Sequence, residues 1–86
     1  MQFPYQTGDK VFLRTVTYHV VGEIKEVGEN FLTLRKASWV ADTERFSVTV
    51  ETGALREVEP VGDMIVNIAA ITDGFPWHHE LPTKAK

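Results

Sequence analysis

Hydrophobic residues along this chain fall in short runs that alternate with polar residues at a period of two. The runs are rich in Val, Ile, Thr and aromatic residues, and turn-forming residues separate them at regular intervals. These turn signals are Thr7-Gly8-Asp9, Gly22, Gly28-Glu29-Asn30, Thr52-Gly53, 59–63 and Asp73-Gly74. Short strands between evenly spaced turns are typical of a small sandwich or barrel, so the pattern predicts an all-β domain.

Three strands are expected in the first half of the chain, over residues 10–16, 18–27 and 31–39. In the second of these, Val20 and Ile24 share one face, with Gly22 between them. A glycine inside a strand marks a sharp bend or a close backbone approach, which a tightly curved barrel requires. Gly28-Glu29-Asn30 then closes a hairpin into the third strand. The inward-facing positions of the first and third strands are expected to be Val11, Leu13, Leu32 and Leu34.

The segment 42–53 fits two interpretations. Phe46, Val48 and Val50 alternate as in a strand, and a Val-Thr-Val sequence is poor helix material. However, Asp42-Thr43-Glu44 resembles a helix start, and Gly53 could be the stop that follows it. We favour a strand here.

Met64 to Ile71 is the last strand that the pattern predicts, and both of its faces are apolar apart from one asparagine. A small barrel covers only one face of a strand, so the other face needs a cover. The cover could be the tail with Phe75 and Trp77, or a second subunit. The tail itself is expected to lie over the barrel and to fray beyond Leu81. The candidate interface for a second subunit consists of Ile65, Val66, Asn67, Ile68 and Ala70.

The length of 86 residues fits one domain, with a barrel core over about residues 9–72 and a tail over 73–86. The chain has no cysteine, which excludes disulfides, thiolate metal sites and thiol nucleophiles. Small domains without such links are commonly stabilised by partner subunits. The chain starts without a signal-peptide pattern and has no apolar run long enough to span a bilayer, so we expect a cytoplasmic protein with no membrane partner.

The residues from Gly22 to Ala37 resemble the Sm-like superfamily of small SH3-type barrels, which contains the Sm and LSm proteins and Hfq. Gly22–Val27 is similar to the bent second strand of that family, Gly28–Asn30 to its hairpin turn, and Phe31–Ala37 to its third strand. The resemblance implies a small, strongly bent five-stranded SH3-like or Sm-like barrel. Val66–Ile71 is similar in placement to the strand pair that joins neighbouring subunits into rings. Some members of the wider group are phage or environmental proteins of unknown function; a phage-encoded member would work in the host cytoplasm.

The chain departs from the RNA-binding members of that family. Their hairpin carries an acidic residue, an aromatic residue or Met, and Asn; here Gly28-Glu29-Asn30-Phe31 has a different order. The Arg-Gly or Lys-His pair near the last strands is also missing. The net charge of −3 disfavours a general nucleic-acid binder. The residues that remain as candidates for nucleic acid are Asn30 and Phe31 for base contact, with Arg35 and Lys36 for phosphate.

No pattern for catalysis or for a cofactor is present. Tyr18-His19 and His78-His79-Glu80 are the only groups that suggest a metal ligand or a base, and adjacent histidines in an extended tail point to opposite sides. There is no Gly-x-Ser-x-Gly turn and no Gly-rich phosphate loop. We therefore expect a protein that is not an enzyme and that holds no metal or cofactor.

Three functions stay open on this basis. The preferred one is a non-catalytic Sm-like protein that forms a homo-oligomeric ring. The first alternative is a module that binds RNA or another single-stranded nucleic acid. The second alternative is a monomeric SH3-type adaptor that binds other proteins.

Overall fold

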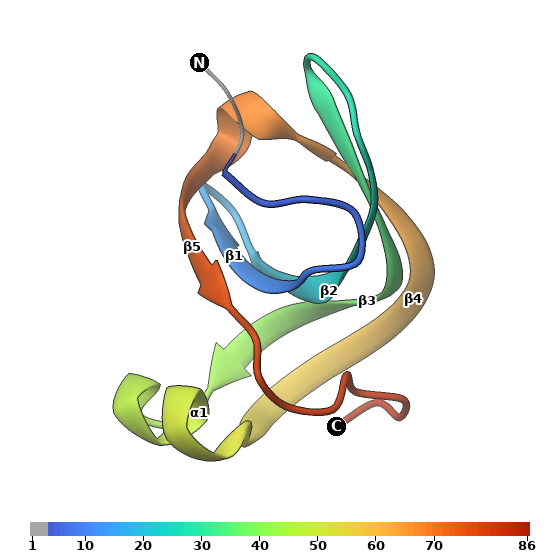
Figure 1. Ribbon diagram of the computed structural model, residues 1–86. Helices are drawn as coiled ribbons and strands as arrows, with labels where there is room; N and C mark the ends of the chain where they lie inside the picture. Colours follow the sequence, from blue (N-terminus) through green and yellow to red (C-terminus); the bar gives the residue numbers. More distant parts are fainter. Residues whose placement is uncertain (1–3) are drawn as a thin grey trace.

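A computed structural model describes residues 4–86 and confirms an all-β fold in which one strongly bent antiparallel sheet curls into a small barrel (Figure 1). Over these residues the order of the strands in the sheet is β4-β3-β2-β1-β5. The elements are β1 (Lys10–Thr15), β2 (His19–Val27), β3 (Phe31–Thr43), α1 (Phe46–Thr52), β4 (Leu55–Asn67), a 3-10 turn (Ile68–Ala70) and β5 (Ile71–Pro76). The sheet thus reaches Pro76, past the expected core limit near residue 72.

The inner core fills the inside of the barrel, and it contains the inward-facing residues that period-two alternation predicts. Its members are Val11, Leu13, Val20, Ile24, Leu32, Leu34, Ala37 and Val66, all buried. Tyr5 from the N-terminal segment and Met64, Ile68 and Ile71 pack against it from the rim. Burial of apolar side chains is the main stabilising term in a domain of this size.

Gly22 provides the bend in β2. A Cβ atom at this position would lie 3.2 Å from both the Cα and the Cβ atoms of Ala37, and 3.2 Å from the Cβ atom of Leu34. These atoms belong to the backbone of β3 or sit directly on it, so they cannot move aside as a flexible side-chain end could. The pairing register between β2 and β3 also shifts between Val21 and Glu23. The predicted close approach at Gly22 is confirmed.

The outer core lies on the opposite face of the sheet, between β1, α1 and the C-terminal segment. Its buried residues are Phe12, Val21, Val40, Leu55, Val58 and Trp77, with Phe46, Phe75 and Leu81 packed against them. The ring of Phe12 lies at the centre, 5.0 Å from the ring of Phe75, 5.6 Å from Trp77 and 6.0 Å from Phe46 between centroids. Because this second core exists, β1 is buried on both faces.

The strand favoured for residues 42–53 is wrong: α1 occupies Phe46–Thr52. The helix places Phe46 and the fully buried Thr49 on its inner side, three residues apart, and leaves Val48 and Val50 exposed. Gly53 ends it with a left-handed φ of 79°, and its N–H donates to the carbonyl of Thr49 (2.8 Å).

The continuous strand predicted over Met64 to Ile71 is also wrong. Asn67 ends β4, and its side-chain Oδ1 accepts a hydrogen bond from the N–H of Ala69 (3.0 Å), which stabilises the 3-10 turn Ile68–Ala70. The chain then enters β5 at Ile71. The argument from two apolar faces of one strand therefore does not hold, because Ile68 and Ala70 do not lie on a strand.

The tail lies over the sheet, as predicted, with Trp77 buried in the outer core. The expected fraying beyond Leu81 is wrong, since Lys86 exchanges two backbone hydrogen bonds with Val58, of 3.0 and 3.3 Å. Figure 1 shows this segment crossing back to the lower part of β4. The tail thus covers part of the outer edge of β4.

We expect Trp77→Ala to lower the free energy of unfolding by about 3–5 kcal/mol, because it empties part of the outer core. Trp39→Ala is the matched control: its ring is 44% exposed and stacks on one neighbour, so the cost should be about 1 kcal/mol. Urea unfolding followed by far-ultraviolet circular dichroism measures both. Equal costs for the two variants would show that the tail does not contribute to the core.

Candidate functional site

The two groups of candidate residues lie at the same end of the barrel. Phe31 pairs with Asn67 and Thr33 with Ile65 in the ladder between β3 and β4. The N–H of Ile68 donates to the carbonyl of Asn30 (3.0 Å), which joins the 3-10 turn to the hairpin. The candidate nucleic-acid residues at the hairpin and the candidate interface residues thus form one continuous region.

Within this region, alternation divides the side chains between core and solvent. Phe31 and Ile65 are 54% and 71% exposed, while their neighbours Leu32 and Val66 point into the inner core. We call the exposed pair Phe31 and Ile65 the hairpin patch. Since exposed residues of this size are costly to hydrate, the hairpin patch is suited to contact with another apolar surface.

Most of the other interface candidates make contacts within the same chain. The side chain of Val66 is buried, and Ile68 packs partly buried against the inner core. Asn67 is exposed, but its side chain holds the 3-10 turn. The carbonyl of Ala70 accepts a hydrogen bond from the N–H of Val16 (3.2 Å). Among the five candidates, Ile65 presents the largest exposed apolar side chain.

The strands at the two ends of the sheet each have one open side. Within residues 4–86, the backbone of β4 hydrogen-bonds to β3 and, outside that ladder, to Lys86 at Val58; β5 pairs with β1 alone. An edge strand presents unpaired N–H and C=O groups that can accept another strand. The protein therefore carries two different open edges.

The basic candidates are not arranged as a phosphate site. Arg35 forms an ion pair with Glu23, its direct partner across the β2–β3 ladder, so its charge is already neutralised. Lys36 is exposed at a bulge and has a left-handed φ of 51°, which is uncommon for a residue other than glycine. Nearby, Lys25 pairs with Asp63 (3.1 Å). The charges around the hairpin are therefore balanced rather than basic.

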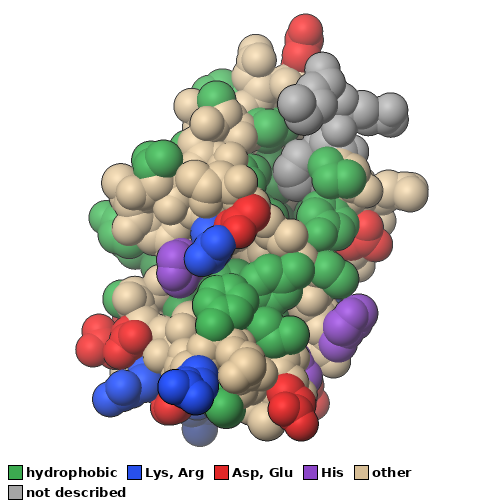
Figure 2. Space-filling view, turned by 90° about the vertical axis from the view of Figure 1, so that its left-hand side faces the viewer, with side chains coloured by type: hydrophobic (Ala, Val, Ile, Leu, Met, Phe, Trp, Pro, Cys, Tyr) green, Lys and Arg blue, Asp and Glu red, His purple; other side chains and the backbone are tan. Residues whose placement is uncertain are grey.

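Figure 2 shows the face of the molecule that carries β5 and α1. Acidic and basic side chains stand there in small mixed groups, and hydrophobic side chains gather between them. No basic band crosses that view. Such a surface does not favour binding along a phosphate backbone.

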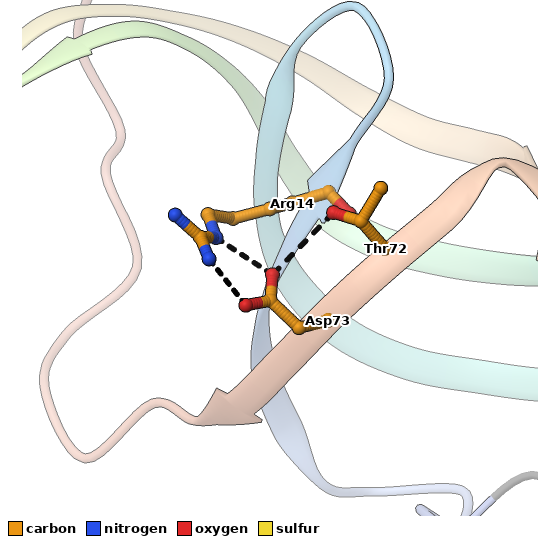
Figure 3. Close-up of polar contacts among 3 residues, drawn as sticks. All are labelled: Arg14, Thr72 and Asp73. Atoms are coloured by element: carbon orange, nitrogen blue, oxygen red, sulfur yellow. Dashed lines mark hydrogen bonds and ion pairs between the residues drawn. The ribbon is translucent and has the colours of Figure 1, made fainter.

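The strongest polar cluster joins β1 to β5 (Figure 3). Arg14 binds both carboxylate oxygens of Asp73, with Nε 2.6 Å from Oδ1, and Thr72 donates to the carbonyl of Arg14 (3.0 Å). The Arg14 guanidinium also lies 5.4 Å from the ring centre of Phe46, on α1. The hydrogen bond from Arg14 holds the pKa of Asp73 below its ordinary value, and Asp73 in turn raises the pKa of Arg14. We interpret this cluster as a clamp for the two strands.

The histidines do not form a metal site. Nε2 of His79 lies 2.8 Å from the carbonyl oxygen of Val50; because a carbonyl can only accept, this nitrogen carries the proton. The ring of His79 also packs edge-on against Trp77. Across residues 4–86 no group of three or more His, Asp or Glu side chains is close enough to hold a metal ion.

No family model, no curated protein and no solved structure matches this chain. Within the described residues, none of the helices is long and apolar enough to cross a membrane.

One feature of the surface was not expected from the sequence. Trp39 is half-exposed and stacks on Tyr18, with ring centres 5.2 Å apart and planes tilted by only 5°. A hollow of about 210 Å³ lies beside the two rings. The two aromatic residues are far apart in the sequence, and only the pairing of β2 with β3 brings them together.

The Arg14–Asp73 clamp should make stability depend on acid. Since the pKa of Asp73 is lowered from its ordinary 3.8, the clamp stabilises the fold above that pH, and the effect is lost as pH falls through the lowered pKa. We expect the difference in Tm between wild type and Asp73→Asn to be present at about pH 6 and to shrink toward about pH 2. Thermal unfolding across this range measures it. Glu29→Gln is the control, because Glu29 makes no ion pair in residues 4–86; an Asp73→Asn difference that does not vary with pH would contradict this role.

Proposed function

We propose that this protein is a non-catalytic, Sm-like barrel that assembles with copies of itself into a closed ring. The observation that carries the proposal is the pair of open edges, β4 at one end of the sheet and β5 at the other. A strand of one copy can complete the ladder of the next, and this removes both edges from solvent.

The assembly would be head-to-tail, because the two edges differ. Pairing of β4 in one copy with β5 in the next uses both edges of every copy, and such a contact closes a ring where the rotation between copies divides a full turn. The backbone of Lys86 already occupies the edge of β4 at Val58. The pairing would therefore use the other half of β4, toward Asn67.

The position of the hairpin patch also favours assembly through the half of β4 toward Asn67. Ile65 lies in this half and is 71% exposed, so a subunit seated there would bury an apolar side chain that the protomer leaves in water. The short chain and the absence of cysteine favour stabilisation by a partner.

The alternative of nucleic-acid binding has one favourable observation, the exposed ring of Phe31, which could stack on a base. Against it stand the neutralised Arg35 and the net charge of −3. The alternative of a monomeric adaptor would be favoured by a stable monomer in solution.

To test the ring, we expect the wild-type protein to have the mass of several subunits by gel filtration coupled to light scattering. Ile65→Lys should shift that mass toward the monomer, because a buried lysine without a partner is strongly unfavourable. Val48→Lys on the exposed side of α1 is the control and should leave the mass unchanged. A wild-type monomer at every concentration, or an Ile65→Lys oligomer of unchanged mass, would overturn the proposal.

For nucleic acid, we expect a fluorescent oligouridylate to show no measurable binding at physiological salt, because the surface around the hairpin is charge-balanced. Fluorescence anisotropy measures this. Binding that decreases with added salt and with Phe31→Ala would instead favour the nucleic-acid alternative.

A further inference from the structure

The stacked pair Tyr18 and Trp39 forms an exposed aromatic surface. A tight turn fixes Tyr18: the N–H and Oγ1 of Thr15 both donate to the carbonyl of Tyr18 (2.8 and 2.7 Å), and Oγ1 accepts from its N–H (3.0 Å). Trp39 is held within β3, where it pairs with Val20. The two rings are 50% and 44% exposed. Two large aromatic side chains thus project from a hydrogen-bonded backbone with much of their surface in water.

Two acidic residues line the same hollow. Glu59 pairs directly with Trp39 in the β3–β4 ladder, so the two side chains are on one face of the sheet. Glu57 lies two residues away on that face of β4, and both glutamates line the hollow with the rings. Ala41, at a bulge of β3, also lines it, and this small side chain leaves the space open.

The carboxylates of Glu57 and Glu59 are not neutralised by the protein. Neither forms an ion pair within residues 4–86, whereas the adjacent Arg56 is engaged with Asp42 and Glu44 (3.8 and 3.9 Å). Lys86 is the one basic residue among the described residues that line the hollow. The hollow therefore combines aromatic faces, two acidic side chains and one basic one, which leaves an excess of negative charge.

We propose that this hollow binds the guanidinium group of an arginine side chain presented by a partner peptide. A cation over the face of Trp or Tyr is attracted by the ring, and more strongly where water is displaced. A planar guanidinium can stack on the aromatic surface while its N–H groups donate to carboxylates, which an ammonium group cannot do in the same geometry. This binding needs no other copy of the chain, so it is independent of ring assembly.

The probe for this site is the peptide acetyl-Gly-Arg-Gly-amide, and its control is the same peptide with citrulline, which has nearly the same shape and no charge. We expect binding with a Kd on the order of 1 mM, since one side chain makes the contacts. In a ¹H–¹⁵N NMR titration, the Trp39 indole N–H and the amides of Ala41, Glu57 and Glu59 should shift. The indole N–H of the buried Trp77 should not. The citrulline peptide should bind at least about tenfold more weakly.

Two variants separate the parts of the site. Trp39→Leu and the double variant Glu57→Gln/Glu59→Gln should each weaken binding of the arginine peptide by about tenfold. The Trp77 indole signal reports that each variant is folded. Glu51→Gln, an exposed residue on α1 outside the hollow, is the charge control and should bind as the wild type does.

Three outcomes would overturn the proposal. The first is the absence of any shift at about 20 mM peptide, well above the expected Kd. The second is equal binding of the citrulline peptide, which would show that charge is not recognised. The third is binding that persists in Trp39→Leu and weakens in Glu51→Gln, which would show general attraction to an acidic surface.

Discussion

The barrel depends on the close approach of β2 to β3 at Gly22. A side chain of any size there would press against the backbone of Ala37 and the first side-chain carbon of Leu34, and the two strands could not bend together. Because they do bend, side chains such as Ile24 and Leu34 enclose the inner core from several sides. The same bend turns the other face of β1 outward, and Phe12 on that face needs a cover of its own.

The cover of Phe12 explains the position of α1 and of the C-terminal segment. The ring of Phe12 packs against Phe46 of α1, which lies between β3 and β4 in the chain. It also packs against Phe75 of β5 and Trp77 of the tail. These aromatic rings pack around one side chain, which is an efficient use of large apolar surfaces in a short chain. Once Trp77 is fixed, the remaining residues return along the sheet, and Lys86 reaches the edge of β4 at Val58.

The inner core could be predicted from sequence because Val20, Ile24, Leu32 and Leu34 follow the period of a strand and Gly22 marks the bend. For residues 42–53 the sequence allows a helix with Gly53 as its stop, and the preference for a strand is wrong because Val48 and Val50 alternate as in a strand. The burial of Thr49, which decides for the helix, is visible only in the structure. The break at Asn67 was missed because it depends on one side-chain hydrogen bond. Neither the outer core nor the Tyr18–Trp39 stack has a local pattern; both arise from contacts between residues distant in sequence.

The hollow for arginine and the edge proposed for ring assembly both use residues of β4, but at different places along the strand. Pro60 has no N–H to offer to a neighbouring strand, Gly62 has a left-handed φ of 80°, and the pairing register with β3 shifts here, so the ladder is irregular through this segment. On one side lie Glu57, Val58 and Glu59, next to the hollow and the tail. On the other side lies Ile65, next to the open part of the edge. A partner arginine and a second copy of the chain could therefore bind to the same strand without competing for the same backbone groups.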